Sequence, residues 1–241
     1  MSTKVRVWDL PVRVFHWLLA VSFVVAYAIA ESDGLRGVHV VLGYTVMALI
    51  TFRIVWGFVG SLFARFRSFA FSPATAIAYA RNTFRHDSRR YLGHNPLGSY
   101  AIYAILFLGM ATGVTGYMRL NDLGGESVEE VHEVFANVWL AIVILHVAGV
   151  IVGSWVHREN LIRAMITGYK DAVQDGNQGE NVAGNRAGVL AGRIVGILVL
   201  VGVAAFWLWA SVTGYQPAER AAREHTSIGI ESGGGSPGSL D

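Results

Sequence analysis

Four of the eight histidines lie within long hydrophobic segments or at their ends, namely His16, His39, His132 and His146. An ionisable side chain is costly in a membrane, so each is a candidate functional residue. His132 and His146 are 14 residues apart in one segment. On a helix this spacing separates them by roughly 21 Å along the axis and about 40° around it. One helix is therefore predicted to present two imidazoles on one face, at two depths.

The other two histidines, His39 and His16, lie at the starts of predicted helices on opposite sides of the membrane, so each can pair with one of the first two. His39 begins its segment on the same side as His132, and we expect these two to form an outer pair. His16 begins the first segment on the other side and is the natural partner of His146, giving an inner pair. The inner depths agree less well, because His146 lies about 15 Å from the end of its apolar run. Either the fourth helix extends past the bilayer or the first helix begins among the headgroups.

Two imidazoles on opposite sides of a flat group suit a low-spin haem, because both axial positions of the iron are filled. The chain has no cysteine, which excludes covalent haem attachment and cysteine-bound iron–sulfur clusters. A single histidine in a membrane helix also serves to hydrogen-bond a neighbouring helix, and that alternative remains for each one alone. The other four, His86, His94, His157 and His225, are interpreted as surface residues.

Arginines near these segments are candidates for binding an anionic group. Arg53 lies within the second apolar segment, where it needs an anionic partner such as a haem propionate, or else extends to lipid headgroups. Arg13 and Arg119, at segment ends, are weaker candidates for propionate contacts. Gly43 and the pair Gly109 and Gly113 either let helices pack closely or make room for a ring.

The elements that carry these residues are predicted to be membrane-spanning helices. Only 15% of the residues are charged and the mean hydropathy is +0.44, whereas a soluble domain has about 25% charged residues. Runs of about 20 apolar residues span a bilayer as helices. The five runs are 14–30, 38–60, 98–118, 134–156 and 194–213. The sequence predicts an all-α membrane protein, with a four-helix transmembrane haem-binding bundle and a fifth C-terminal transmembrane helix.

Loop charges predict the orientation of these helices. Most lysines and arginines fall before the first run and after the second and fourth, while the two opposite loops hold only Arg36 and Arg119. The second of those loops is acidic. By the positive-inside rule the N-terminus is cytoplasmic in a bacterial inner membrane and the C-terminus periplasmic. Because the arginines flank apolar segments, the basic pI of about 9.0 indicates a membrane protein, and no nucleic acid is expected as a partner.

The same pattern divides the chain into four parts. Residues 1–170 form the four-helix dihaem domain, 171–193 a polar cytoplasmic linker, 194–214 the fifth helix and 215–241 a flexible periplasmic tail. A further helix at the membrane surface is expected to begin at Pro73.

The chain resembles the prokaryotic cytochrome b561 family, which includes b-type subunits of nickel–iron hydrogenases. The matching stretches are Val7–Trp17, Gly37–His39, Arg53–Gly57, Gly93–Gly98, Glu130–Glu133 and Leu145–His146. The resemblance implies a four-helix bundle with two non-covalent b haems, one between His16 and His146 and the other between His39 and His132. It also implies electron transfer between a quinone and a partner redox protein.

These features leave three possible functions for the chain. The first is a dihaem electron carrier of a respiratory chain, between the quinone pool and a periplasmic protein such as a c-type cytochrome, with quinone oxidoreductase activity left open. The acidic outer loop would attract a basic partner. The second is a membrane-anchor cytochrome b subunit of a larger oxidoreductase such as a hydrogenase. The third is a transporter or scaffold without haem, whose histidines bind metal or protons.

Overall fold

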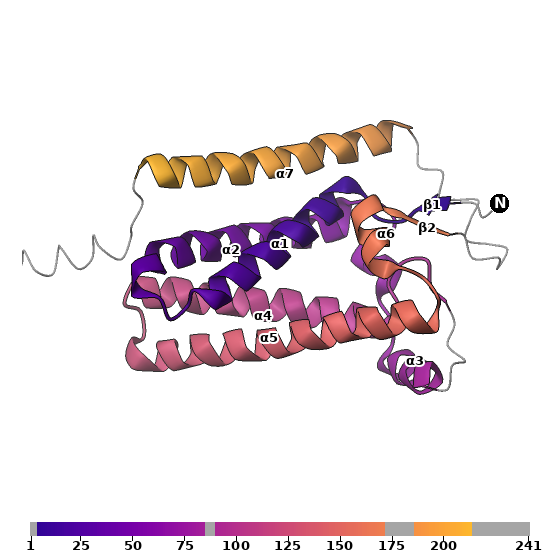
Figure 1. Cartoon of the computed structure of the whole chain (residues 1–241), viewed down its shortest axis with the longest axis horizontal. Coiled ribbons are helices and arrows are strands. Elements are labelled where there is room, and N and C mark those ends of the chain that lie inside the picture. Colours follow the sequence, from indigo (N-terminus) through magenta and orange to yellow (C-terminus); the bar gives the residue numbers. More distant parts are fainter. Residues whose placement is uncertain (1–3, 85–89, 172–185, 214–241) are drawn as a thin grey trace, which may run out of the picture.

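The computed structural model describes residues 4–84, 90–171 and 186–213. Within them, five helices are long and apolar enough to cross a membrane. They are α1 (Leu10–Ala28), α2 (Arg36–Val59), α4 (Pro96–Leu120), α5 (Gly125–Val156) and α7 (Arg186–Val212). The first four run side by side, and α7 lies along the edge of this bundle next to α1 (Figure 1). The predicted fold class is confirmed.

Capping residues start two of these helices earlier than the apolar runs indicated. The Asp9 carboxylate accepts the Val12 backbone N–H at 2.8 Å, so α1 begins at Leu10. The Asn95 side chain accepts the Gly98 N–H at 2.7 Å, so α4 begins at Pro96. Each cap satisfies a backbone donor that the first helical turn leaves unpaired.

Helix α5 is the longest, with 32 residues. It begins nine residues before its predicted apolar run, in the acidic segment that includes Glu126 and Glu129. His146 still lies roughly 15 Å from the end of α5, but the early start of α1 places His16 roughly 9 Å inside its helix. The depth difference within the inner pair therefore shrinks to about 6 Å.

The core of the bundle lies between α1, α2, α4 and α5. It consists of Phe15, Leu19, Phe23, Val46, Leu49, Ile50, Leu106, Leu108 and Trp139. Helices approach closely at Gly109, where a Cβ atom would lie 2.7 Å from the Trp139 ring. Small residues let membrane helices pack in this way. Large apolar side chains on the outward faces, such as Leu145 and Phe107, are exposed and suit contact with lipid.

Short elements gather at the N-terminal end of the bundle (Figure 1). They are the 3₁₀ helix η2 (Phe66–Phe69), helix α3 (Pro73–Phe84) at the predicted position, helix α6 (Leu161–Thr167), and strands β1 (Lys4–Arg6) and β2 (Tyr169–Asp171). The other 3₁₀ helix, η1 (Asp33–Leu35), lies at the opposite end. The strands pair antiparallel, with Val5 opposite Lys170. This ladder of three residues per strand was not predicted, because such short strands have no clear sequence pattern.

A buried ion pair holds β2 to the end of α5. The Lys170 ammonium lies 3.3 Å from a Glu159 carboxylate oxygen and donates to the Tyr91 carbonyl at 3.1 Å. Arg90 lies 3.1 Å from the other Glu159 oxygen. Burial lowers the pKa of Lys170, and the nearby Glu159 charge opposes that shift.

Replacing Lys170 by Met is expected to destabilise the folded protein by about 3 kcal/mol, because it leaves Glu159 buried with only Arg90 as a partner. The melting temperature of the detergent-solubilised protein should fall by several degrees. Lys4→Met is the matched control, since Lys4 is exposed on the paired strand and is the only other lysine. Equal melting temperatures for the two variants would contradict a stabilising role for the pair.

Helix α7 begins at Arg186, eight residues before the predicted start at 194 and within the predicted linker. Alanine and leucine before residue 194 favour helix, although they were not counted in the apolar run. It packs on α1 through Gly196, where a Cβ atom would lie 2.8 Å from the Leu10 side chain. It also contacts α2, since the Trp207 indole donates to the Thr45 hydroxyl at 3.1 Å. Most of the predicted linker and nearly all of the predicted tail lie outside the described residues.

Candidate haem-binding site

The structure brings the two outer histidines together across the bundle. The ring centroids of His39 on α2 and His132 on α5 are 6.4 Å apart, with an angle of 72° between the ring planes. Metal–imidazole bonds are about 2 Å long, so two nitrogens that share one metal lie about 4 Å apart and the ring centres lie somewhat further. The observed separation agrees with two imidazoles on opposite sides of one metal ion.

Backbone carbonyls orient both of these rings. Nδ1 of His39 lies 3.0 Å from the Ala26 carbonyl oxygen, and Nδ1 of His132 lies 3.0 Å from that of Thr112. Because a carbonyl only accepts, each Nδ1 is the protonated nitrogen and Nε2 is left with its lone pair. Metal-bound histidines are held in this way, with the second ring nitrogen donating to a carbonyl.

A pocket of about 540 Å³ surrounds the outer pair, between α1, α2, α4 and α5. Its volume lies in the range of cofactor pockets, roughly 300–1,000 Å³. Four of its lining residues are glycines, Gly43, Gly109, Gly113 and Gly116. A Cβ atom at Gly116 would lie 3.0 Å from the His132 ring. The glycines leave space for a flat ring system beside the imidazoles.

The pocket changes from apolar to polar towards the end of the bundle. Phe23, Val46 and Trp139 line it at depth. Its rim carries charged residues from the loops and helix ends, Glu31, Asp33, Arg36, Arg119, Glu129 and Glu133. Arg119 and Glu129 form an ion pair there. An apolar interior with a charged rim fits a group that has a hydrophobic face and an ionised edge, as haem has.

The inner histidines face the bundle at the N-terminal end. His16 on α1 and His146 on α5 are close enough for the charge of one to act on the other. His16 Nδ1 is buried without a hydrogen-bond partner among the described residues. Its ring packs edge-on against Trp17, with centroids 5.0 Å apart.

Arg53 lies deep in the structure, where its charge and that of His146 both act on His94. Only 3% of its surface is exposed, and the guanidinium carbon lies 5.1 Å from the centre of the Phe66 ring. Its Nη1 is buried and has no hydrogen-bond partner in the described part of the chain. A buried guanidinium with an open donor is suited to binding a carboxylate.

His94 is a second residue of this region, and its interpretation as a surface residue was wrong. Its ring packs 4.6 Å from Trp8 and 4.4 Å from Phe69, between centroids, and its Nδ1 is buried without a described partner. Burial, together with the charges of Arg53, Lys170 and His146, lowers the pKa of His94 to about 3. His94 is therefore neutral at neutral pH.

The three other histidines interpreted as surface residues, and Arg13, lie outside these two sites or outside the described residues. His157, also interpreted as a surface residue, lies 3.1 Å from the Tyr79 hydroxyl through Nε2 and is half-buried. His86 and His225 lie outside the described residues. Arg13 donates to the Ile166 carbonyl at 2.5 Å and lines a second, smaller pocket.

The sequence between the first strand and α6 matches a known family. Residues 7–168 match the family model described as prokaryotic cytochrome b561. A probable Ni/Fe-hydrogenase B-type cytochrome subunit of Azotobacter vinelandii is 25% identical, over 70% of this chain and 89% of the relative. A protein of the same description from Rhodobacter capsulatus is 24% identical, over 72% of this chain and 84% of the relative.

A third relative of that description, from Rhizobium leguminosarum bv. viciae, is 23% identical, over 68% of this chain and 88% of its own length. No solved structure matches the chain. The family match covers α1, α2, α4 and α5 with all four histidines, and it ends before α7. With five membrane-spanning helices and a family match over two thirds of its length, this multi-pass membrane protein belongs to the prokaryotic cytochrome b561 family.

Proposed function

We propose that the chain binds two b haems and transfers electrons between a membrane quinone and a partner redox protein. The outer haem would lie between His39 and His132, and the inner haem between His16 and His146. One observation carries the proposal. The two outer imidazoles face each other across a 540 Å³ pocket, each with Nδ1 held by a backbone carbonyl and Nε2 left for a metal.

The chain's own residues would orient the cofactor and exclude other ligands. The Ala26 and Thr112 carbonyls hold the imidazole rings in one tautomer and one orientation. The pocket glycines on α2 and α4 would leave room for a flat ring system. Haem iron with two imidazole ligands exchanges single electrons and has no open position for oxygen.

At the inner site, Arg53 and His94 would bind a propionate. Both offer a buried nitrogen that has no hydrogen-bond partner among the described residues, Nη1 of Arg53 and Nδ1 of His94. A buried donor left unpaired costs about 1–3 kcal/mol, more when it is charged, and a propionate would supply acceptors to both. The propionate contact predicted for Arg13 remains a prediction from the sequence.

Arg53→Met is expected to lower the occupancy of the inner haem while the outer haem stays bound, because the inner propionate loses its cationic partner. The measurement is haem content per protein in purified samples, together with a potentiometric titration of the haem absorbance. Arg67→Met is the matched control, since it removes an exposed arginine at the same end of the bundle. Equal occupancy in both variants would contradict the Arg53 assignment.

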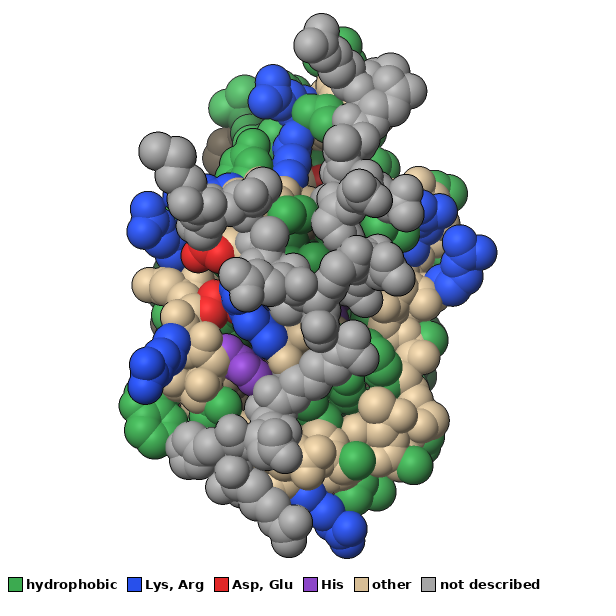
Figure 2. All heavy atoms as spheres, turned by 90° about the vertical axis from the view of Figure 1, so that its right-hand side faces the viewer, with side chains coloured by type: hydrophobic (Ala, Val, Ile, Leu, Met, Phe, Trp, Pro, Cys, Tyr) green, Lys and Arg blue, Asp and Glu red, His purple; other side chains and the backbone are tan. Residues whose placement is uncertain are grey.

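We further propose that the N-terminal end faces the cytoplasm and that the membrane is a bacterial inner membrane. Figure 2 looks onto this end, where lysine and arginine side chains are spread over the surface. Cytoplasmic loops carry an excess of these residues. The outer haem would then lie near the periplasmic surface, where the acidic segment around Glu126 and Glu130 would attract a basic partner such as a c-type cytochrome.

A second candidate function is supported by the relatives. Proteins described as probable Ni/Fe-hydrogenase B-type cytochrome subunits align over 84–89% of their own length. The chain would in that case anchor a larger oxidoreductase to the membrane and receive its electrons. Affinity purification in mild detergent separates the two candidates, because an anchor subunit retains stoichiometric enzyme subunits and a free carrier does not.

The test of the haem proposal is a reduced-minus-oxidised spectrum of the purified protein with a haem-to-protein ratio. Two non-covalent haems per chain are expected, both extractable with acidified acetone. A colourless protein would contradict the proposal and favour the transporter or scaffold. A ratio of one would restrict the proposal to a single pair.

A further inference from the structure

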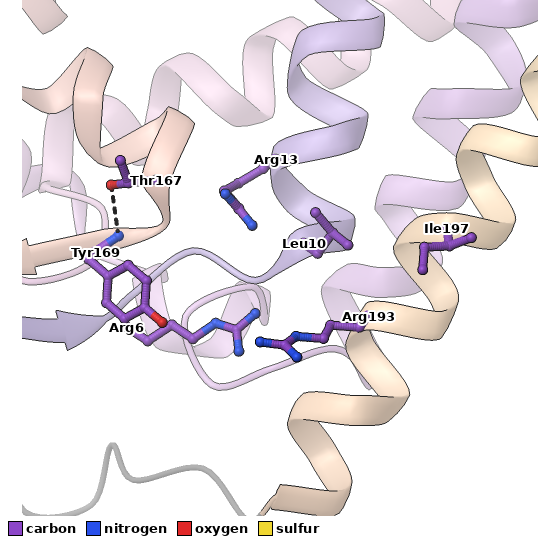
Figure 3. Close-up of a pocket in the computed structure, with 7 residues that line it drawn as sticks. All are labelled: Arg6, Leu10, Arg13, Thr167, Tyr169, Arg193 and Ile197. Carbon is purple, nitrogen blue, oxygen red and sulfur yellow. Dashed lines mark hydrogen bonds between the residues drawn. The ribbon is translucent and has the colours of Figure 1, made fainter.

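A second pocket of about 250 Å³ lies at the N-terminal end, and none of its described lining residues is a histidine. Its basic side chains come from three separate elements, Arg6 on β1, Arg13 on α1 and Arg193 on α7 (Figure 3). Tyr169 and Thr167 add hydroxyl groups, and Leu10 and Ile197 form an apolar wall. The fold therefore brings Arg193 from the last described helix to two arginines near the N-terminus.

These cations are only partly balanced, because the charge of Asp9 acts on Arg13 from outside the pocket. No aspartate or glutamate lines the pocket in the part of the chain that the structure describes. The nearest in sequence is Asp9, and its oxygens accept from the Val12 N–H at 2.8 Å and the Trp56 indole at 3.0 Å. Like charges held together without an anion repel each other. The pocket is thus incomplete without a negatively charged group.

The geometry of the arginines is suited to an anion between them. In Figure 3 the guanidinium groups of Arg6 and Arg193 point toward one another across the pocket. Neither guanidinium group makes a hydrogen bond or ion pair with another residue that the structure describes. Arg13 Nε is buried and has no hydrogen-bond partner in the described part of the chain, although Arg13 Nη1 donates to the Ile166 carbonyl. Guanidinium groups bind phosphate oxygens through paired N–H donors.

We propose that this pocket binds the phosphate group of an anionic phospholipid. Leu10 begins α1 and Arg193 lies in the first two turns of α7, so the pocket is level with the ends of two spanning helices. Headgroup phosphates of a bilayer lie at this level. Basic pockets between transmembrane helices on the cytoplasmic side bind anionic headgroups. The apolar wall of Leu10 and Ile197 faces the side on which acyl chains would lie.

The bound lipid would fasten the fifth helix to the bundle. α7 lies outside the family match, and its contact with α1 at this end depends on small residues, including Gly196 against Leu10. Arg193 belongs to α7, whereas Arg6 and Arg13 belong to β1 and α1. A phosphate bound by all three arginines would link α7 to the bundle, and no ion pair between protein side chains would have to break for it to bind.

The test uses the full-length haem-loaded protein in detergent and the double variant Arg6→Gln with Arg193→Gln. Arg13 is left unchanged because it is also a predicted haem contact. Phosphatidylglycerol is titrated and binding is followed by native mass spectrometry. Affinity is expected to fall roughly tenfold to thirtyfold, from about one kcal/mol per arginine. The control variant, Arg67→Gln with Arg163→Gln, removes two exposed arginines at the same end and should bind as the wild type does.

Several outcomes would overturn the proposal. These are unchanged binding in the double variant, an equal loss in the control, or equal binding of phosphatidylcholine. If inorganic phosphate raises the melting temperature of the protein as much as the lipid does, the ligand of the pocket is a free anion and the lipid proposal is wrong. The single variant Arg193→Gln decides the matter if the double variant does not fold, as judged from its haem spectrum. Because haem content is read separately, failure here is distinct from failure of the haem proposal.

Discussion

Replacing His132 by Gly is expected to remove the outer haem and halve the haem content of the purified protein. The substitution would delete one of the two proposed haem ligands and leave His39 without the imidazole that faces it. The inner pair lies roughly 21 Å away along α5 and should keep its haem. Haem per protein, measured by pyridine haemochrome, gives the ratio directly.

Two companion measurements sharpen this test. His146→Gly should remove the other haem, and the double variant should be colourless. Imidazole added to the His132→Gly protein should restore part of the outer haem absorbance, because it can occupy the position of the missing ring. Glycine within a helix costs about 0.5–1 kcal/mol, too little to unfold the bundle. Full haem content in both single variants would show that the ligands are wrongly assigned.

Filling the outer pocket without touching a ligand is expected to have nearly as large an effect. A Cβ atom at Gly43 would meet no protein atom within 4 Å, although Gly43 lines the pocket. Gly43→Leu should therefore fold, place its side chain in the space proposed for the haem, and lose most of the outer haem. The measurement is again haem content, with thermal stability as the check on folding.

Gly149→Leu is the matched control for this substitution. Gly149 lies on α5, is exposed, does not line the pocket, and its Cβ would likewise meet nothing within 4 Å. The two variants add the same side chain to a helix glycine, one inside the pocket and one towards lipid. If Gly43→Leu retains both haems, the pocket around the outer pair is not the haem site.

The sequence alone determined the membrane fold and the helices that carry the histidines. Long apolar runs leave no alternative to helices, because every backbone polar group must be paired without water. All five runs fall within α1, α2, α4, α5 and α7, apart from one or two residues at some ends. The helix ends were less accurate, because the caps at Asp9 and Asn95 lie outside the apolar runs that were counted.

The spacing of His132 and His146 likewise fixed their shared face, since helix periodicity is a local property. The approach of His39 to His132, and the carbonyls of Ala26 and Thr112 that orient the two rings, depended on how four helices pack. The matched depths of His39 and His132 had predicted that these two residues pair, but no local pattern encodes which backbone carbonyl orients each ring. The same holds for His94, which has a loop sequence and a buried environment.

Only the tertiary structure decided which arginines act together. In the sequence, Arg6, Arg13 and Arg193 look alike as basic residues next to apolar segments, and the positive-inside rule accounts for each of them separately. Strand pairing between β1 and β2 and the packing of α7 on α1 bring them to one pocket. Charge composition is set by the chain, whereas the distance between charges is set by the fold, and binding of an anion depends on that distance.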